Sequence, residues 1–542
     1  MSFRRNLSGW VALIASWGVA VPLFAATAGP ASGTPAEDLP PGLRPTQVNV
    51  TNDLMRRYGE PEVVVNPRNP NNLVYFVMSN KLTYKCEAAG DPNCTTLFFG
   101  LALGQFIVPG WTSDRVFVSF DRGRTWKNVN FPLIPRFRGF PGEATDHSGL
   151  LTSADPMVTA TADGTFYIAW DSEHEGLTTT ATYGGIAISK STDGGRTWST
   201  PVLTGTPVDR PWLTADLSTG TIYEASGTPP GTGFLGSFST GNPSLPFNAP
   251  PGDRWLVASR DGVHWTTPQR LGGGGVPGFA GASGNTISAA NGVLAATLRA
   301  TDNASCQFFV AALAPCTVFE TTRDAGVTWD RHLVPVPADS TGSIMIAADP
   351  VRRGTYSLAV LNSTGTEFLV LATHDSGATW SQMPTVVTDD PNTTKFKSWM
   401  SYSHTGVLGL AWRSIAADAD VANVTATSSQ AASAEPEASA PSTEYNVFAA
   451  ISLDEGETFS DPLKISTAES PSPDPNMPFG TDDTSFINLD NEDAFVAWGD
   501  WRPGDVSGFF STVKLRAFCV SDEGHRSGGL PRCDRRPAPP SH

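Results

Sequence analysis

Pairs of short hydrophobic runs recur along the chain, and a tight turn joins the two members of each pair. Examples are "EVVVNPRNPNNLVYFV" (62–77), "PMVTATADGTFYIAW" (156–170) and "TISAANGVLAATL" (286–298). Alternation of polar and apolar positions over a few residues, bounded by turn residues, is typical of β-strands. The 52 Gly and 44 Pro residues favour many turns over long helices. The pattern predicts an all-β protein built from hairpins.

A third strand follows each hairpin and ends in an octapeptide with a hydroxyl residue, an Asp, a Gly and a terminal aromatic residue. The six copies are "SFDRGRTW" (119–126), "STDGGRTW" (191–198), "SRDGVHW" (259–265), "TRDAGVTW" (322–329), "THDSGATW" (373–380) and "SLDEGETF" (452–459). The third copy is one residue short and the sixth ends in Phe459, so we expect these two turns to be distorted.

The chemistry of the octapeptide favours a structural turn over a catalytic site. An Asp carboxylate can accept backbone N–H groups inside a turn, a Gly can adopt positive φ, and the aromatic ring can pack between neighbouring units. We therefore predict that the six Asp residues brace turns: Asp121, Asp193, Asp261, Asp324, Asp375 and Asp454.

A short strand usually follows each octapeptide, so every unit contains four strands, at a spacing of 51 to 79 residues between successive Asp residues. Units of four strands at this period are typical of propeller blades. A seventh set of strands lies at 484–500 and 508–518, without an octapeptide or a clear fourth strand. The segment "PTQVNVT" (45–51) can supply the missing strand and remove an open sheet edge. We predict a seven-bladed β-propeller closed by pairing of the N- and C-terminal strands; six blades with a separate small sheet are the alternative.

The ends of the chain and one insertion do not follow the repeat. Residues 1–28 combine Arg4 and Arg5, a short apolar stretch and small residues, which predicts a secretory signal peptide; a retained anchor is the alternative. We expect a flexible linker at 29–44, the propeller at 45–518, a disordered Ala/Ser/Pro-rich insertion at 415–443 and a C-terminal tail at 519–542. No later segment is long and apolar enough to span a membrane, so we expect a mature chain secreted or held in the cell envelope.

Charge and cysteine usage narrow the partners and the compartment. The formal net charge of −17 argues against binding nucleic acid, which requires a basic face. The six Cys residues form three pairs of close spacing, which in an exported protein suggests local disulfides: Cys86 with Cys94, Cys306 with Cys316, and Cys519 with Cys533. Zinc binding is the weaker reading because no C-x-x-C spacing is present. The oligomeric state is not determined by these features.

The octapeptides resemble the Asp-box, or BNR, repeat, and from about residue 45 to residue 518 the chain resembles secreted members of the sialidase superfamily. The resemblance implies a ligand site at the end of the central channel away from the octapeptides, built from the starts of the innermost strands and the loops after the second strands. At those positions this sequence has Glu60, Glu62, Asn80, Lys81, Asp155, Asp171, Glu173, His174, Glu175, Asp209, Arg210, Arg299, Asp339, Lys395, Lys397, Arg413, Asp482, Asp483, Asp500 and Arg502.

The resemblance implies a secreted glycoside hydrolase that acts on an extracellular glycan or glycoconjugate. The family uses arginines to hold a sugar carboxylate, and the fork of donors on Arg matches that group. The candidates on this sequence are Arg210, Arg299, Arg413 and Arg502, although an Arg at a strand end is also an ordinary surface or salt-bridge residue. Candidate catalytic carboxylates are Asp155, Asp171, Glu173 and Asp209.

Two alternatives to a sialidase-type hydrolase stay open. The loop "AWDSEHE" (169–175) can supply a general acid with a raised pKa or the oxygen ligands of a calcium site. It can equally be a solvated acidic loop without such a role. The family also pairs a Tyr nucleophile with a Glu, but Tyr223 and Glu224 are adjacent and so face opposite sides of a strand. A non-catalytic propeller that binds a glycan or a protein at the channel mouth is therefore the second reading.

Overall fold

The structure used here is a computed structural model of the chain. It describes residues 35–53, 56–81, 97–101, 104–108, 114–130, 151–175, 182–206, 210–227, 239–240, 254–271, 287–300, 303–416, 444–471, 484–504 and 506–519. The expected signal peptide, nearly all of the expected insertion and the expected tail beyond residue 519 lie outside these residues, as do Cys86, Cys94 and Cys533.

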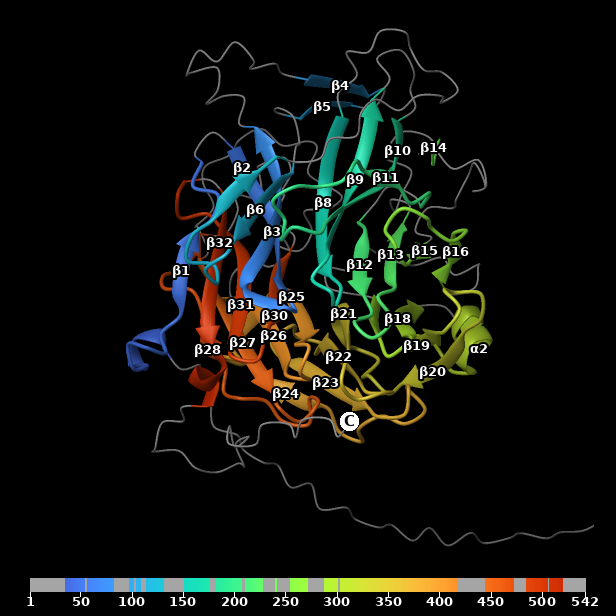
Figure 1. Ribbon diagram of the computed structural model, residues 1–542. Coiled ribbons are helices and arrows are strands. Elements are labelled where there is room, and N and C mark those ends of the chain that lie inside the picture. Colours follow the sequence, from blue (N-terminus) through green and yellow to red (C-terminus); the bar gives the residue numbers. More distant parts are fainter. Residues whose placement is uncertain are drawn as a thin grey trace, which may run out of the picture.

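Seven antiparallel sheets of four main strands (Figure 1) form a ring, and their innermost strands line a central channel. We call the strands of each sheet A to D, from the channel outwards. Blade 1 contains β2 (Arg56–Asn66), β3 (Asn69–Lys81), β6 (Arg115–Ser119) and β7 (Lys127–Val129). Blade 2 contains β8 (Leu151–Ala160), β9 (Phe166–Glu175), β10 (Thr182–Ser191) and β11 (Val202–Leu203). Blade 3 contains β12 (Trp212–Ala215), β13 (Ile222–Gly227), β15 (Arg254–Ser259) and β16 (Gln269–Arg270).

The remaining blades repeat this order. Blade 4 contains β17 (Ile287–Ala290), β18 (Val293–Ala300), β19 (Cys316–Thr322) and β20 (Asp330–Val334). Blade 5 contains β21 (Thr341–Ala348), β22 (Tyr356–Leu361), β23 (Phe368–Thr373) and β24 (Thr385–Val387). Blade 6 contains β25 (Thr393–Tyr402), β26 (Leu408–Ala416), β27 (Glu444–Ser452) and β28 (Leu463–Lys464).

Blade 7 takes its strands from both ends of the chain. It contains β30 (Ser485–Leu489), β31 (Asp493–Asp500), β32 (Ser507–Lys514) and β1 (Thr46–Asn49). Strand β1 pairs antiparallel with β32, with Thr46 opposite Thr512 and Asn49 opposite Phe509. The predicted seven-bladed propeller and its closure by the terminal strands are confirmed, and the six-bladed alternative is wrong.

The octapeptides form the C–D turns at one end of the ring, which we call the turn end; the A–B turns lie at the same end because successive strands are antiparallel. In the second copy, Asp193 accepts hydrogen bonds from the Ser191 hydroxyl (2.8 Å), the Thr197 amide (2.9 Å) and the Thr197 hydroxyl (2.6 Å). The Gly195 amide donates to Ser191 Oγ (2.9 Å). These side-chain and backbone contacts close the turn, and Asn72 Nδ2 of blade 1 donates to the Gly194 carbonyl at 3.0 Å.

The other copies show how far this turn tolerates change. The copies at Asp121, Asp324, Asp375 and Asp454 repeat the same contacts. The sixth copy is thus not distorted by its terminal Phe. In the short third copy, Asp261 instead accepts from the Val263 and His264 amides, and its carboxylate contacts His264 Nδ1 at 2.7 Å. An imidazole therefore replaces the threonine hydroxyl.

Each octapeptide turn packs against the preceding blade. A Cβ added at Gly195 would lie 2.6 Å from Val118 of blade 1, and one at Gly326 would lie 3.1 Å from Leu256 of blade 3. The aromatic residue of the turn packs in the same direction, since the Trp380 ring lies 5.2 Å from the Phe319 ring of blade 4. Blade 7 has no octapeptide, so the contact between blades 6 and 7 lacks this element.

The B–C and D–A connections, at the opposite end, carry elements that the repeat does not predict. Between β3 and β6 the chain forms a separate two-stranded sheet of β4 (Leu97–Leu101) and β5 (Gly104–Val108). Strand β14 (Ser239–Thr240), from the B–C connection of blade 3, pairs with β10 of blade 2, and β29 (Ser470–Pro471), after β28, pairs with β27 of blade 6. Two short 3-10 helices, η1 (Ala36–Asp38) and η3 (Leu515–Cys519), flank the terminal strands. The octapeptide pattern could not reveal these elements because they lie away from the turns it marks.

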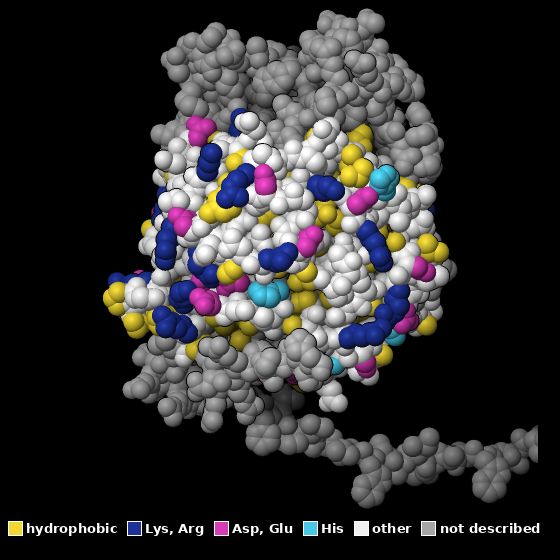
Figure 2. Space-filling view, viewed as in Figure 1, with side chains coloured by type: hydrophobic (Ala, Val, Ile, Leu, Met, Phe, Trp, Pro, Cys, Tyr) yellow, Lys and Arg dark blue, Asp and Glu magenta, His cyan; other side chains and the backbone are white. Residues whose placement is uncertain are grey.

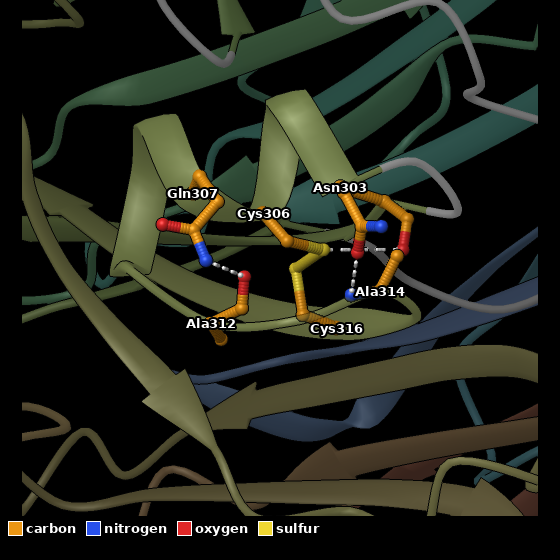
Figure 3. The surroundings of a disulfide bond; sticks show 7 residues. Asn303, Cys306, Gln307, Ala312, Ala314 and Cys316 are labelled. Carbon is orange, nitrogen blue, oxygen red and sulfur yellow. Dashed lines mark hydrogen bonds between the residues drawn. A yellow bond between two sulfur atoms is a disulfide. The ribbon is translucent and has the colours of Figure 1, made fainter.

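A short helix, α2 (Asn303–Val310), precedes strand C of blade 4 and is clipped to it by a disulfide (Figure 3). Cys306 and Cys316 are bonded, which confirms the second predicted pair. Asn303 Oδ1 accepts the Ala314 amide at 2.9 Å, and Gln307 donates to the Ala312 carbonyl at 3.1 Å. Cys519 is also disulfide-bonded, and its predicted partner lies outside the described residues.

Candidate functional site

The A strands begin irregularly at the end of the channel opposite the turns, which we call the mouth end. The pairing of strands A and B shifts register between Gly59 and Glu62 in blade 1, between Ala154 and Met157 in blade 2, and between Phe396 and Trp399 in blade 6. Such bulges bend a strand and redirect its side chains. All three lie within two or three residues of a predicted ligand position.

Four charged residues at equivalent positions near the starts of the A strands have positive φ: Glu60 (53°), Asp155 (50°) and Lys397 (50°), which lie in the bulges, and Arg210 (48°), which precedes β12. A non-glycine residue at positive φ carries backbone strain, and such strain concentrates at ligand sites. We call these four residues the mouth charges. Glu60 is buried, whereas the other three are half-buried. The sequence places two carboxylates in blades 1 and 2 and two cations in blades 3 and 6.

A proline follows three of the mouth charges, at Pro61, Pro156 and Pro211. Proline has no N–H to donate to a strand ladder, so regular pairing is interrupted at this level of the channel. At this level the Arg210 amide donates to Asp155 Oδ2 at 3.2 Å, which links blade 3 to blade 2. Two predicted site residues, Asp155 and Arg210, are thereby joined directly.

A layer of aromatic rings lies two residues further along the A strands. The Trp212 ring of blade 3 lies 5.8 Å from the Trp399 ring of blade 6, and Trp399 lies 4.4 Å from Phe486 of blade 7. Contact between blades 3 and 6 requires the rings to span the channel. We call Trp212, Trp399 and Phe486 the aromatic layer; it forms a floor below the mouth charges. The sequence signal was the shared spacing, since each Trp stands two residues after a mouth charge.

Glu62 occupies the equivalent position in blade 1 and is fully buried. Its Oε2 accepts the Val158 amide of blade 2 at 2.8 Å. Burial raises the pKa of Glu62 well above its usual value, and the bond from Val158 opposes that shift only in part. Glu62 is thus a buried hydrogen-bonding group in the wall of the channel rather than an exposed group at its mouth.

Glu224 in strand B of blade 3 is a second buried carboxyl group. Its Oε2 accepts the Thr206 hydroxyl at 2.7 Å, from the chain that leaves blade 2. Burial raises the pKa of Glu224 to about 7, against the lowering effect of hydrogen bonds from Thr206 and other hydroxyls. Glu224 follows Tyr223 directly in β13, as expected, so the two side chains do not pair across one face.

The predicted carboxylates are only partly described. Asp171 lies in the middle of β9, opposite Ile186 of β10, and is buried, and Asp155 is one of the mouth charges. The side chains of Glu173, His174 and Glu175 and the whole of Asp209 lie outside the described residues. No group of three or more His, Cys, Asp or Glu side chains in the described part of the chain is placed to hold a metal. The calcium alternative for the 171–175 loop stays a prediction.

The predicted arginines are held by different partners. Arg413 is 1% exposed; it donates to Ser485 Oγ (2.9 Å) and the Thr484 carbonyl (2.8 Å) of blade 7, and lies over the Tyr445 ring. Arg502 forks onto Asp500 at 2.8 and 2.6 Å. Arg299 donates to the chain that leads into blade 5. Of the four arginines, Arg210 alone is a mouth charge.

The other predicted positions have structural contacts or lie outside the description. Lys395 is buried and pairs with Asp389 at 2.9 Å, and burial lowers its pKa. Asp339 is exposed on the surface. Asp482 and Asp483 and the side chains of Asn80 and Lys81 are not described. Basic and acidic side chains are interspersed over the face of the molecule drawn in Figure 2. Among the described helices, none is long and apolar enough to cross a membrane.

No protein-family model matches the chain, and no curated protein has significant sequence similarity to it. Solved structures align with most of this chain at low sequence identity. A Dyadobacter fermentans protein of unknown function is 14% identical, with a TM-score of 0.44, over 88% of this chain and 100% of that one. A Hadza microbial sialidase is 14% identical, with a TM-score of 0.38, over 87% and 96% of the two chains. A mutant NanB sialidase from Streptococcus pneumoniae is 11% identical, with a TM-score of 0.37, over 87% and 71%.

Proposed function

We propose that the protein is a secreted glycoside hydrolase of the sialidase type, which acts on extracellular glycans at the mouth end of the channel. The observation that carries the proposal is the set of mouth charges held at positive φ above the aromatic layer. Strained, charged strand ends are costly for folding and are retained where they position groups for a ligand. Aromatic rings beneath polar groups suit a sugar, which has apolar C–H faces and polar edges.

The contact between Asp155 and Arg210 suggests a division of roles. A half-buried carboxylate can act as general acid or base, and a guanidinium can hold an anionic or hydroxylated sugar group. The Arg210 amide donates to Asp155 Oδ2 and so orients this carboxylate. In this proposal Asp155 transfers the proton and Arg210 and Lys397 hold the substrate, with Glu60 as the second carboxylate of the mouth.

The decisive experiment measures release of the fluorophore from a fluorogenic sialoside, and from a panel of other glycosides, by the purified protein. We expect turnover that falls by roughly a hundredfold or more in Asp155→Asn, because general acid catalysis contributes about that much. Arg210→Met should raise KM. Asp461→Asn and Arg323→Met, at exposed positions away from the mouth, are the matched controls.

A non-catalytic propeller that binds a glycan at the same mouth is the second candidate. It is favoured by the partners of Arg299, Arg413 and Arg502, each of which is used in contacts within the ring. No turnover on any glycoside, together with glycan binding that Arg210→Met weakens, would replace the first proposal by this one. Activity unaffected by both Asp155→Asn and Arg210→Met would overturn the site itself.

A further inference from the structure

The channel contains a cavity of about 150 Å³ on the turn side of the aromatic layer. All seven A strands contribute to its wall, Trp212, Trp399 and Phe486 form its ceiling, and A–B turn residues such as Pro67 and His404 lie at its other end. We call this cavity the turn-end chamber. The aromatic layer separates it from the mouth charges, so it is a different site from the one proposed above and does not depend on it.

The wall of the chamber has one polar belt. Thr159, Thr214, Ser401 and Asn488, from four different A strands, are half-exposed although they lie inside the ring. Ser401 donates to the Ile487 carbonyl at 2.6 Å, and Asn488 Oδ1 accepts the Val65 amide at 3.2 Å. The belt therefore keeps hydroxyl and amide groups at the surface of the cavity, where a small molecule can reach them.

The ceiling supplies an unsatisfied donor. Trp212 is 3% exposed, lines the chamber, and its indole N–H has no hydrogen-bond partner among the described residues. A buried N–H without a partner costs about 1–3 kcal/mol of stability. An acceptor atom on a molecule in the chamber would remove that cost.

The described wall of the chamber contains no Asp, Glu, Lys or Arg side chain. Among the described residues of its wall, only His404 and Tyr402 can titrate. Burial lowers the pKa of His404 and raises the pKa of Tyr402. The Tyr402 hydroxyl forms a hydrogen bond with Ser357 Oγ at 2.7 Å. No charge in the wall would compensate an ionic ligand, which disfavours ions.

We propose that the turn-end chamber binds a small uncharged aromatic alcohol of the size of phenol. The ring would lie against Trp212, Trp399 and the aliphatic wall, and the hydroxyl would meet the polar belt and the indole N–H. The volume is suitable, since a cavity of about 150 Å³ in an engineered protein core holds one benzene molecule.

Calorimetric titration of the full-length purified protein with phenol tests the proposal, with sodium benzoate as the charged counterpart. We expect saturable binding of phenol with a Kd of about 1 mM or tighter, within reach of a ligand with so few atoms. Benzoate should bind at least roughly tenfold more weakly, because its charge would be buried without a partner.

Variants locate the binding. Ala289→Leu, which adds three carbon atoms to the chamber wall, should abolish phenol binding, whereas Ala378→Leu at an exposed position of the fifth octapeptide should leave it unchanged. Thr214→Val keeps the shape of the wall but removes a hydroxyl, so it should weaken binding about three- to tenfold. Thr214→Val also tests the location of the bound phenol if the Ala289→Leu variant does not fold.

Two results would overturn the proposal. Absence of saturable heat up to about 10 mM phenol would mean that the chamber holds water alone, since a specific ligand of this size should bind more tightly. Equal phenol affinity in the wild type, Ala289→Leu and Thr214→Val would place the bound phenol elsewhere.

Discussion

Asp324 at the turn end and Glu224 near the mouth end are carboxyl groups of the same ring, and their surroundings shift their pKa values in opposite directions. The Thr328 hydroxyl and amide donate to Asp324 and lower its pKa. Burial dominates at Glu224 and raises its pKa to about 7. The Thr379 hydroxyl and amide lower the pKa of Asp375 in the same way. Burial raises the pKa of Glu62, as it does that of Glu224.

The difference teaches which end of the ring stabilises the fold. A carboxyl group with a lowered pKa stabilises the protein when it is ionised, and one with a raised pKa destabilises it when ionised. The turn end repeats one set of short-range contacts around the ring, in which each octapeptide Asp accepts hydrogen bonds from its own turn. The mouth end combines bulges, positive φ and buried acids, which are costs that a folded protein tolerates where a ligand site requires them.

The contact between blades 6 and 7, which lacks an octapeptide, gives the largest expected effect. Arg413→Ala removes a buried guanidinium that joins β26 to the start of β30, so we expect the free energy of unfolding to fall by about 3–5 kcal/mol. Urea unfolding measures this. Arg299→Ala, at a half-exposed position, should cost under about 1 kcal/mol. Equal losses for the two variants would show that Arg413 has no special structural role.

Packing of an octapeptide turn on the preceding blade gives the next effect. Gly195→Ala places a methyl group against Val118 at a φ of +87°, so we expect a loss of about 2–4 kcal/mol in unfolding free energy. Gly504 has a similar φ of +92° but no atom within 4 Å of an added Cβ. Gly504→Ala should therefore cost only about 1 kcal/mol. Equal losses of unfolding free energy in Gly195→Ala and Gly504→Ala would mean that backbone strain at positive φ, rather than contact with the preceding blade, sets the cost.

The pH dependence of Glu224 tests the mouth end. Its pKa is raised from 4.5 to about 7 on folding, so the folded protein binds the proton more tightly and loses stability as the pH rises from about 4.5 to 7. The loss amounts to about 2–3 kcal/mol at 1.4 kcal/mol per pH unit.

Glu224→Gln removes this dependence. We expect the variant to unfold at higher urea than the wild type at pH 8 and at similar urea near pH 4.5, because a protonated Glu and a Gln are both neutral. Glu37→Gln, at an exposed position, is the control and should follow the wild-type profile. Parallel profiles for Glu224→Gln and the wild type would contradict the raised pKa.

The smallest effect belongs to a single octapeptide carboxylate. Asp193→Ala loses the bonds from Ser191 and Thr197 at a half-exposed site, and we expect a cost of about 1–2 kcal/mol at pH 7. The lowered pKa of Asp193 means that this contribution is present above its unfolded pKa and is lost as the pH falls through the folded pKa. The difference between variant and wild type, measured by urea unfolding, should therefore shrink in acid. A difference that grows in acid would contradict the stabilising effect assigned to the ionised carboxylate of Asp193.

Much of the architecture follows from sequence because it depends on residues that are close along the chain. An octapeptide contains its own donors and acceptors, so the role of Asp193 was predictable from eight residues. Counting octapeptides and strand pairs was enough to predict seven blades and the closing strand at Thr46. Cys306 and Cys316 were paired correctly because ten residues separate them.

The candidate site was predictable only as a set of positions. Asp155 and Arg210 were named from their place at strand starts, but their contact depends on two blades meeting. Arg413 has the same position in its blade as Arg299, yet one is buried between blades and the other half-exposed. The aromatic layer was missed because Trp212 and Trp399 are far apart in sequence and meet only across the channel.

The sequence by itself therefore determined the fold, the blade count, the order of strands and the turn end, since each of these is written in a local pattern that repeats. The tertiary structure decided which charges are strained at the mouth, which acids are buried and where the channel is divided. Those features depend on distances between blades, and the physical terms that set them, burial and contact across the channel, act between residues that no local pattern connects.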